Sequence, residues 1–518
     1  MIKEIQIRVL PPEASNNDIL KKIVAHKENI PLSDITYVQI LKRSIDARKF
    51  PVYYQLRLAV YIKEEYTEAV FENEYQDVKK AEKTIHIIGS GPAGLFAALE
   101  ALKLGVKPVI FERGKDVKTR RRDLAAINKK GAVNTESNYC FGEGGAGTYS
   151  DGKLYTRSKK KGSVKDILKT LVIHGAPTDI MVDAHPHIGT NKLPKLIENI
   201  RKVILEKGGE IHFGHKMTDI TLIDNRISSV TINNEKEIEV ENLILATGHS
   251  ARDIYHLLNE KKIELEFKSF ALGVRIEHKQ ELIDQIQYKS KDRSEFLPPA
   301  SYSLVSQVKD RGVYSFCMCP GGVIAPCATG KEEVVTNGWS PSKRNNPFSN
   351  SGIVTEVRWD DIPNFHKYGA LAGLYFQQSV EKKAWELGGK TQQVPAQRLL
   401  DFIQRKKSIS LPKTSYFPGV VSVELDEVFP TFITNSLREG IAKFGNKMKG
   451  YMTNEAVLHA TESRTSSPVR IPRDRYSLEH PKVLGLYPCG EGAGYAGGIV
   501  SAAIDGVLIV RKIVEVNK

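Results

Sequence analysis

Three glycines near residue 90 have the spacing of a dinucleotide-binding turn. Gly89, Gly91 and Gly94 form G-x-G-x-x-G, directly after the apolar stretch IHIIG and before a helix-forming run. In such a turn the first glycine allows a tight bend, the second lets backbone approach a pyrophosphate, and the third lets helix pack on strand. A helix beginning at Pro92 and Ala93 would present free N–H groups and its positive dipole end to the phosphates. The pattern predicts a dinucleotide site that includes these five residues.

An acidic residue follows at the spacing that such a site requires. Glu112 ends the second predicted strand, about 20 residues beyond the turn, where a carboxylate can accept hydrogen bonds from both ribose hydroxyls. It would repel a 2′-phosphate, so the site favours FAD or NAD over NADP. Arg113 comes next and is included among the predicted cofactor contacts. An incidental strand, turn and helix with a surface glutamate is the alternative.

Two later segments favour FAD over NAD. The strand-like NLIL leads into Ala246-Thr247-Gly248, and the chain closes with GLYPCGEGAGYAGGIVSAAIDG. Glycines there would let the last helix begin beside a flavin ring, where its dipole favours the negative charge of the reduced flavin. A tightly packed helix entry is the alternative. The contacts predicted in these segments are Thr247, Gly248, Gly490, Glu491, Gly497, Gly498 and Ile499.

A third glycine-rich stretch, FGEGGAGTYSDGKLYTR, begins at residue 141. We expect Gly145, Ala146, Gly147 and Thr148 to lie along the flavin ring and the pyrophosphate. Lys153 is a predicted catalytic residue, because a cation close to flavin N1 or N5 would raise the reduction potential of the flavin. A solvated turn is the alternative.

Histidine residues are the predicted proton carriers. His185 and His187 lie in DAHPHIGTNKL, and His187 is the predicted catalytic member, because histidine titrates near neutral pH. His249 is a second candidate. The pair lacks a convincing third or fourth ligand, so no metal site is predicted. A structural role for the pair is the alternative.

Three cysteines lie close together in FCMCPGGVIAPC. Cys317 and Cys319 form C-x-C, which strains a disulfide ring, and with Cys327 they still lack the four ligands of a zinc or iron–sulfur site. Buried apolar cysteines are the favoured interpretation. A catalytic thiolate is the alternative.

Arginines concentrate in ATESRTSSPVRIPRD. Arg464 and Arg470, with Arg473 near by, could hold a carboxylate or phosphate through the planar guanidinium fork. We predict that Arg464 and Arg470 anchor an acidic substrate. A basic loop paired with the protein's own carboxylates is the alternative.

Charge and composition narrow the classes of protein. The 518 residues include 75 Lys or Arg and 61 Asp or Glu, and residues 113–165 alone hold 14 of the former and 5 of the latter. This positive field could attract an anionic cofactor, an anionic substrate or nucleic acid, or be a solvated basic loop. No apolar run of about 18 residues and no signal peptide is visible. With five cysteines, the sequence predicts a cytoplasmic protein without a membrane partner.

The segments that must position these residues predict an α/β protein. Residues 1–80 would form a small α+β module, with strand, helix, strand and strand in that order. Residues 81–250 and 481–518 would build a Rossmann-type FAD-binding domain, with an inserted mixed α+β substrate domain at 251–480. Within these, we expect a helix in KLPKLIENIRKVILEKGG, a β-meander in KMTDITLIDNRISSVTINNEKEIEV and a helix around YGALAGLYFQQSVEKKAWELGG.

Six motifs resemble those of a known family. They span roughly residues 84–510, with SIDARK at 44–49 as an extension, and read GSGPAGLFAALEAL, FGEGGAGTYSDGKLYTR, HPHIGTNKL, FCMCPGG, ESRTSSPVRIPRD and GEGAGYAGGIVSAAIDG. The chain is similar to the bacterial FAD-dependent dehydrogenases, also called NAD(FAD)-utilising dehydrogenases, within the glutathione-reductase-like two-dinucleotide flavoproteins. The first and last motifs are shared by many flavoproteins, and the middle four are more specific. The resemblance implies an FAD-binding fold with an inserted substrate domain and supplies no substrate.

The sequence thus predicts an FAD-dependent oxidoreductase that transfers a hydride between flavin N5 and a small, anionic organic substrate. No second G-x-G-x-x-G follows ILATGHS, so NAD(P)H would bind only transiently as an electron donor. One alternative is a flavin-dependent RNA-modifying or RNA-bound protein, although nucleic acid is the less favoured partner. Another is a non-catalytic flavin-binding redox sensor.

Overall fold

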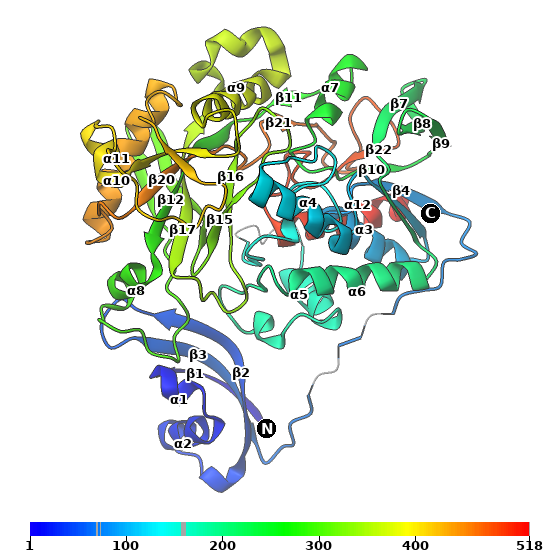
Figure 1. Ribbon diagram of the computed structural model, residues 1–518. Coiled ribbons are helices and arrows are strands. Elements are labelled where there is room, and N and C mark those ends of the chain that lie inside the picture. The colour runs from blue at the N-terminus through cyan, green and yellow to red at the C-terminus, as the bar shows by residue number, and fades with distance from the viewer. Residues whose placement is uncertain (69–70, 73, 157–161, 517–518) are drawn as a thin grey trace.

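The computed structural model describes residues 1–68, 71–72, 74–156 and 162–516 (Figure 1). Part of the predicted basic stretch, residues 157–161, therefore lies outside the described residues, as do 69–70 and 73 of the segment that follows the N-terminal module. Within the described ranges, no helix combines the length and the apolar character needed to cross a membrane.

The N-terminal module is a three-stranded antiparallel sheet with helices on one face. Its elements are β1 (Ile2–Val9), α1 (Pro11–Ala14), α2 (Asn17–Glu28), β2 (Ile35–Asp46) and β3 (Tyr53–Ile62). The sheet order is β1-β3-β2, and the side chain of Asn16 caps α2 by accepting two backbone N–H groups. The predicted order of strand, helix, strand and strand is confirmed.

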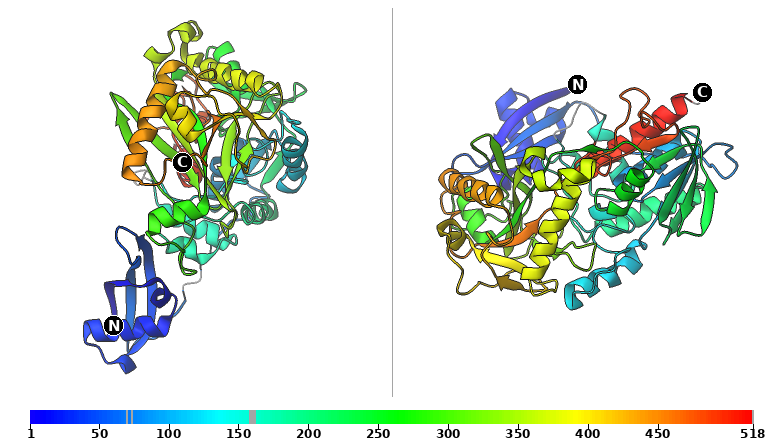
Figure 2. Two further views of the ribbon diagram at one scale, coloured as in Figure 1. Left: turned by 60° about the vertical axis from the view of Figure 1, so that its left-hand side comes forward. Right: turned by 90° about the horizontal axis from the view of Figure 1, so that it is seen from above.

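This module lies to one side of the rest of the chain (Figure 2). Strand β2 anchors it, because the Arg43 N–H donates to the Val182 carbonyl at 3.0 Å and Arg43 Nε donates to Asp183 Oδ1 at 2.8 Å. The Tyr54 hydroxyl donates to the Phe296 carbonyl at 3.0 Å. The module therefore touches the body of the protein at two separate places.

A parallel five-stranded sheet forms the first half of the body. Its order is β22 (Leu486–Pro488), β10 (Leu243–Leu245), β4 (Thr84–Ile88), β5 (Lys107–Glu112) and β6 (Glu210–Phe213). Register places Ile88 opposite Phe111 and Leu245, and Leu245 opposite Pro488. Four strands therefore end in one row, and the chain enters the loops after them at the same edge. The chain end returns to this sheet through β22, so this is a Rossmann-type α/β fold, as predicted.

Apolar side chains bury both faces of this sheet. On one face lie α3 (Pro92–Lys103), α5 (Val164–Ile173), α6 (Leu193–Glu206) and α12 (Ile499–Val516). On the other lie α7 (Arg252–Glu260) and the meander β7 (Met217–Ile223), β8 (Arg226–Ile232) and β9 (Lys236–Glu239). Burial on both faces explains the near-continuous apolar sequence of the parallel strands. The predicted helix at 192–209 and the predicted meander are confirmed as α6 and β7–β9.

The second half is built on a seven-stranded mixed sheet. Its order is β13 (Val305–Val308), β14 (Arg311–Cys319), β17 (Phe348–Val357), β12 (Phe270–Lys279), β20 (Val457–Glu462), β18 (Val394–Arg398) and β19 (Val420–Ser422). Its helices are α8 (Gln280–Tyr288), α9 (Ala372–Leu387), α10 (Leu399–Gln404) and α11 (Thr431–Lys447). The helix predicted around residues 368–389 is confirmed as α9. The boundaries predicted for the domains stay predictions.

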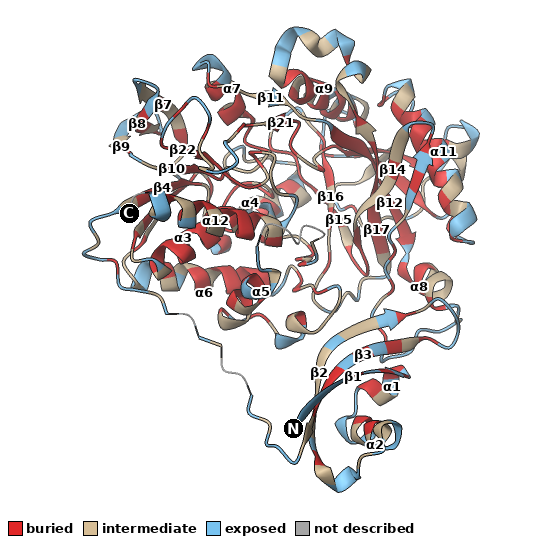
Figure 3. Ribbon diagram, turned by 180° about the vertical axis from the view of Figure 1, so that it is seen from behind, coloured by how far each residue is buried: buried red, intermediate tan, exposed pale blue. Residues whose placement is uncertain are grey.

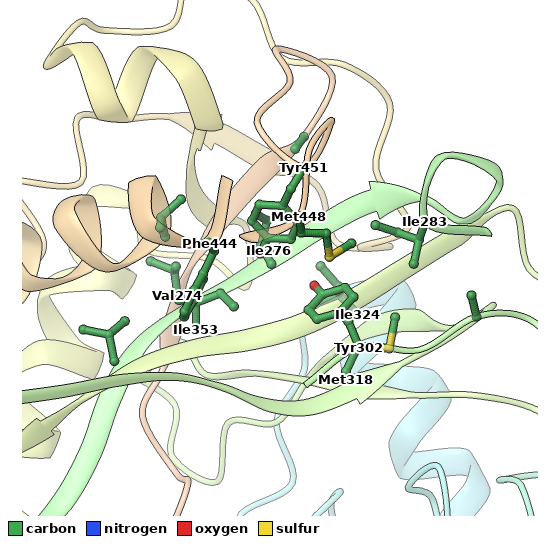
Figure 4. Close-up of a cluster of buried hydrophobic side chains, with 14 of the residues drawn as sticks. Val274, Ile276, Ile283, Tyr302, Met318, Ile324, Ile353, Phe444, Met448 and Tyr451 are labelled. Atoms are coloured by element: carbon green, nitrogen blue, oxygen red, sulfur yellow. The ribbon is translucent and has the colours of Figure 1, made fainter. Parts of the chain in front are cut away.

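Packing of α11 on this sheet makes the largest core. Figure 4 shows Phe444 of α11 beside Val274 and Ile353 of the sheet, with Met448 and Tyr451 continuing the contact. These five residues are buried, and the ribbon of α11 in Figure 3 carries both buried and exposed residues. Helix α11 thus buries one face of the seven-stranded sheet.

Shorter elements connect the two halves. They are α4 (Val117–Lys130), the pair β15 (Val323–Pro326) and β16 (Thr336–Trp339), and the pair β11 (Glu266–Phe267) and β21 (Val469–Arg470). Helix α4 belongs to the first half and packs its Leu124 and Ile127 against Ala325 of β15. These contacts hold the carboxyl edge of the parallel sheet opposite β14 and β16.

Candidate functional site

A cavity of about 390 Å³ lies between the two sheets. One wall is the carboxyl edge of the parallel sheet, where Ile88, Phe111, Ala246 and Cys489 follow or end four strands. Ligands of open α/β sheets bind at this edge. The opposite wall comes from the other half of the chain, with Phe316, Cys317, Thr336, Asn337, Glu462, Arg464 and Thr465.

The glycines of the first turn serve three different steric needs. Gly89 has φ +101°, and a Cβ there would lie 2.5 Å from the Ala246 carbonyl oxygen. A Cβ on Gly94 would overlap the carbonyl oxygen of Gly89, so this glycine sits behind the wall and lets helix meet strand. Gly91 differs, because the nearest described atom to its Cβ position is Gly145 Cα at 3.9 Å. Gly91 lines the cavity as the N-cap of α3. The absence of a side chain there therefore leaves room for a ligand.

The glycine-rich segments at 145–147 and 490–498 meet at the start of α12. A Cβ on Gly147 would lie 3.3 Å from Ile499 Cγ1 and 3.4 Å from Pro92 Cγ. A Cβ built on Gly497 or Gly498 would have no described atom within 4 Å apart from those of the glycine and its chain neighbours. The structure thus brings three glycine-rich segments, far apart in sequence, to one cavity, and the last two glycines leave room there.

These features fit FAD. The N-termini of α3 and α12 both open on the cavity, and the N–H groups of a helix start bind phosphate or a reduced flavin's negative charge. The glycine positions keep that space clear. The predicted contacts that line the cavity are Gly89, Gly91, Pro92, Ala93, Glu112, Arg113, Gly145, Ala146, Gly147, Thr247, Gly248, Glu491, Gly497, Gly498 and Ile499.

Glu112 is engaged more fully than the sequence suggested. Its Oε2 accepts from the N–H and the hydroxyl of Ser90, each at 2.9 Å, and its Oε1 accepts from the N–H groups of Gly114 and Gly142, at 2.8 and 2.9 Å. A carboxylate has about four lone-pair sites, so all are occupied. A ribose hydroxyl would have to replace one of these partners, such as the buried Ser90 hydroxyl.

Three other predicted contacts lie behind the wall. Besides Gly94, these are Thr148, whose hydroxyl donates to the Glu143 carbonyl at 2.8 Å, and Gly490, whose N–H donates to Asp505 at 2.8 Å. Both residues therefore shape the loops rather than face the cavity.

The basic stretch after residue 113 is partly internal. Arg113 lines the cavity but pairs with Glu136 and Asp253, at 2.6 and 2.8 Å. Arg120 is fully buried and donates to the carbonyls of Asn138, Glu143 and Gly145, at 2.7, 3.0 and 3.0 Å. It thereby holds the glycine loop in place. These two arginines are structural, which weakens the prediction of an attracting positive field.

The structure places two predicted catalytic residues outside the cavity. His187 Nε2 lies 3.3 Å from the Ser342 carbonyl oxygen, and burial lowers the pKa of this imidazole. Arg470 is partly exposed and pairs with Glu266 at 3.5 Å. Neither residue is among the described residues that line the cavity.

Arg464 does line the cavity, but carboxylates already hold it. Its guanidinium pairs with Glu333 at 2.6 Å and Glu381 at 3.1 Å. Arg252 joins the same network, at 3.1 Å from Glu333 and 2.8 Å from Glu381. The alternative interpretation of this arginine, pairing with the protein's own carboxylates, describes it better than substrate anchoring. The two glutamates carried no sequence signal, because they lie in unremarkable surroundings far from Arg464 in the chain.

Lys153 reaches across to the opposite wall. Its Nζ donates to the Met318 carbonyl and lies 3.8 Å from Cys317 Sγ, 3.9 Å from Cys319 Sγ and 3.5 Å from Asp151. The sequence predicts that this lysine lies near the flavin. In the structure it also lies beside the thiols of Cys317 and Cys319, which are far from it in the sequence.

A glutamate with a perturbed pKa faces the cavity from the C-terminal loop. Burial raises the pKa of Glu491 to about 7, and its Oε1 lies 3.8 Å from His249 Nε2. Burial and the charge of Arg464 lower the pKa of His249 to about 3. Near neutral pH the imidazole is therefore neutral, and Glu491 is a cavity group that can exchange a proton.

Replacing Glu491 by glutamine should change how stability depends on pH. The folded carboxyl keeps its proton up to about pH 7, whereas an unfolded glutamate releases it near pH 4.3. This carboxyl therefore stabilises the fold least above pH 7, and its contribution falls as pH rises through that window. We expect the melting temperature of Glu491→Gln, relative to the parent, to be higher at pH 8 than at pH 5.

A matched control is Glu439→Gln, which alters an exposed glutamate paired with Lys443 on α11. Its melting temperature should differ little from that of the parent at either pH. Equal shifts for Glu491→Gln at the two pH values would show that Glu491 titrates like an ordinary glutamate.

In the described part of the chain, His, Cys, Asp and Glu form no group of three or more that could hold a metal ion.

Known proteins match the chain in separate parts and as a whole. Residues 83–270 match the pyridine nucleotide-disulphide oxidoreductase family, and residues 269–465 match the family described as FAD-dependent protein, C-terminal domain-like. Residues 1–61 match a domain of unknown function. The chain is 40% identical over 517 residues to an uncharacterized protein of Clostridium beijerinckii, with 96% of each chain covered.

Solved structures resemble the chain more remotely. The tetracycline destructase Tet(51) is 11% identical with a TM-score of 0.34, and the match covers 84% of this chain and 83% of that one. FqzB is 12% identical with a TM-score of 0.35, over 85% and 78%.

Proposed function

Since this chain belongs to a family of FAD-dependent proteins that joins a pyridine nucleotide-disulphide oxidoreductase domain to an FAD-dependent C-terminal domain, we propose that it is an oxidoreductase transferring a hydride between FAD and a small organic substrate. Its place in the glutathione-reductase-like branch is part of the same proposal. The observation that carries it is a single cavity with two unlike walls. One wall has the glycines and helix starts that suit FAD, and the other has polar side chains that suit a second ligand.

When bound, FAD supplies the two-electron chemistry of its flavin ring. The chain's own part is to hold and orient. The N–H groups at the start of α3 would hold the pyrophosphate, and the start of α12 would lie against the flavin. Glu112, which lines the cavity, would meet the ribose.

A proton must also move when a hydride is exchanged with most organic substrates. The sequence assigned this to His187, but Glu491 faces the cavity and has a pKa of about 7. A group whose pKa lies near the working pH is best suited to accept and return a proton. We therefore assign the proton to the Glu491 carboxylate in place of His187.

The cations of the cavity wall bear on the charge of the substrate. Each Lys or Arg on the described cavity wall already lies within 4 Å of a carboxylate: these are Arg113, Lys153, Lys216 and Arg464. Lys153, on the substrate side, is the cation that could also meet an anion. The anionic substrate expected from the sequence stays a prediction, and Lys153 is the side chain on which it depends.

The test is a visible spectrum of the purified protein, followed by anaerobic titration. We expect yellow protein with about one FAD per chain. Its flavin absorbance should bleach with NADH, NADPH or one member of a substrate panel. The panel should pair each carboxylic acid with its neutral amide, because the pair separates hydride chemistry from charge recognition. Bleaching by NAD(P)H alone would support nicotinamide as the transient electron donor.

Two results would contradict the proposal. Colourless protein that refuses added FAD would remove the cofactor. Yellow protein that no reductant or substrate bleaches would favour the flavin-binding redox sensor. The RNA-bound alternative loses two of its cations, since Arg113 is paired and Arg120 is buried, whereas Arg121 and Arg122 of the same stretch are exposed.

A further inference from the structure

Two cysteines of β14 stand at an irregularity of the strand. Pairing of β14 with β17 shifts register between Phe316 and Cys319. Cys317, inside this break, has φ +46°, a left-handed conformation that is uncommon for a residue with a side chain. Bulges re-aim side chains, and here Cys317 lines the cavity whereas Cys319 is buried behind it.

The cation at Cys317 comes from the other half of the chain. Lys153 lies in the loop after the first βαβ unit, and its Nζ sits 3.8 Å from Cys317 Sγ and 3.9 Å from Cys319 Sγ. The Met318 carbonyl accepts a hydrogen bond from the same ammonium, which fixes it between the two sulfurs. A positive charge so close favours the thiolate form of a cysteine.

A second, independent feature marks this part of the cavity as a ligand site. Asp151 lines the cavity with a side chain that is only 1% exposed. Its Oδ2 accepts from Arg344 at 2.9 Å, but its Oδ1 has no hydrogen-bond partner among the described residues. A buried carboxylate oxygen without a hydrogen-bond partner is costly unless something binds it.

Charges of both signs face Cys317. The cations are Lys153 and Arg275, and the anions are Asp151, Glu462 and Glu491. The hydrogen bond from the Cys319 thiol, then the charges of Lys153 and Arg275, hold the pKa of the Cys317 thiol well below its usual range, against the effect of burial. The pKa of Cys319 is raised, so this thiol keeps its proton, and its S–H donates a hydrogen bond to the Cys317 carbonyl oxygen at 3.3 Å.

We propose that Cys317 is a nucleophilic site that captures small α,β-unsaturated carbonyl compounds in the cavity. The thiolate sulfur forms a bond to the β-carbon, and the C=C π electrons shift onto the carbonyl oxygen. The Lys153 ammonium then supplies the proton that the α-carbon takes up, and water returns it to the amine. This addition needs no oxidant and no second reactant. The addition also does not depend on hydride transfer. It can therefore be tested separately from the proposed oxidoreductase activity.

The probe is N-ethylmaleimide, a small activated alkene, applied as a short pulse to the protein as purified. Peptide mass spectrometry then gives the rate at each cysteine. We expect Cys317 to react fastest, with a rate that changes less than about threefold between pH 6 and 8, whereas a thiol of pKa about 8.5 gains about 70-fold. Cys140 lines the same cavity with Sγ facing the Cys327 carbonyl, and it is the matched control.

Variants separate activation from access. Lys153→Gln should slow the labelling of Cys317 at pH 6 about tenfold, and Lys153→Arg should restore most of the rate. Cys140→Ser should leave the rate at Cys317 unchanged. The proposal is overturned if Cys317 takes no label, if Cys140 reacts as fast, if the rate follows pH like an ordinary thiol, or if Lys153→Gln has no effect. A disulfide joining Cys317 and Cys319 in the purified protein would overturn it as well.

Discussion

Gly91→Val is expected to yield folded protein that has lost its flavin. FAD per purified chain should fall to about a tenth of the parent value or less, because the valine side chain would occupy the place of the pyrophosphate, and each 1.4 kcal/mol of lost binding is tenfold in affinity. The melting temperature of the FAD-free variant should stay close to that of FAD-free parent protein. Flavin absorbance and differential scanning fluorimetry measure the two quantities.

The geometry at Gly91 separates binding from folding. Its φ of −72° and ψ of −175° are open to any residue, and 3.9 Å to Gly145 Cα leaves space for a Cβ. The valine methyl groups would therefore occupy the cavity at the start of α3, where backbone must approach the pyrophosphate. Valine is also a poorer N-cap than glycine, which costs at most about 1 kcal/mol.

Two glycines elsewhere give matched controls. Gly312, on β14, also has space around its Cβ position but lies outside the cavity, so Gly312→Val should keep both FAD and stability. Gly94→Val should fail differently, because a Cβ there overlaps the Gly89 carbonyl and the helix must separate from the strand. Yellow Gly91→Val protein with the parent's FAD content would refute the assignment of this cavity to FAD.

The fold could be predicted because its signals are local. Apolar runs bounded by glycine turns gave the parallel strands, and alternating Val, Ile and Tyr gave β1 to β3. The convergence of the distant glycine segments was also predictable, since a bare backbone before a helix is informative wherever it occurs. Gly91 and Gly497 line one cavity for that reason.

Side-chain partners could not be predicted in the same way. The guanidinium of Arg464 suggests an anion in any sequence, but only the fold reveals that Glu333 and Glu381 already provide it. The same limit applies to Glu112, whose partners are backbone N–H groups that sequence cannot locate. Residue type shows what a group can bind, and packing decides whether its partner is internal.

Arg275→Met is expected to give the largest loss of stability in the second half of the protein. Arg275 lies in the centre of the seven-stranded sheet and is fully buried. Its Nε and Nη2 donate to the two carboxylate oxygens of Glu462, at 2.7 and 2.8 Å, and its Nη1 donates to Asn350 at 2.7 Å. Removing one partner of such a pair leaves a buried charge and costs about 3–5 kcal/mol.

The double variant Arg275→Met with Glu462→Met should be milder than the single one. It removes both charges, and replacing a buried ion pair by apolar side chains of similar volume is often close to neutral. The difference between the single and double variants therefore measures the cost of the orphaned carboxylate. Glu439→Ala breaks an exposed pair on α11 and should cost less than about 0.5 kcal/mol, which calibrates the scale.

The pH dependence identifies the cause of the loss. Burial already raises the pKa of Glu462 in the parent, and in Arg275→Met the loss of the neighbouring cation raises it further above the unfolded value near 4.3. The folded state then binds a proton that the unfolded state releases, and the deficit in the free energy of unfolding grows as pH rises through that window. Urea titrations should show a smaller deficit, relative to the parent, at pH 5 than at pH 8. If the deficit is the same at both pH values, lost packing of the arginine side chain explains it, and the double variant should then be no more stable than the single one.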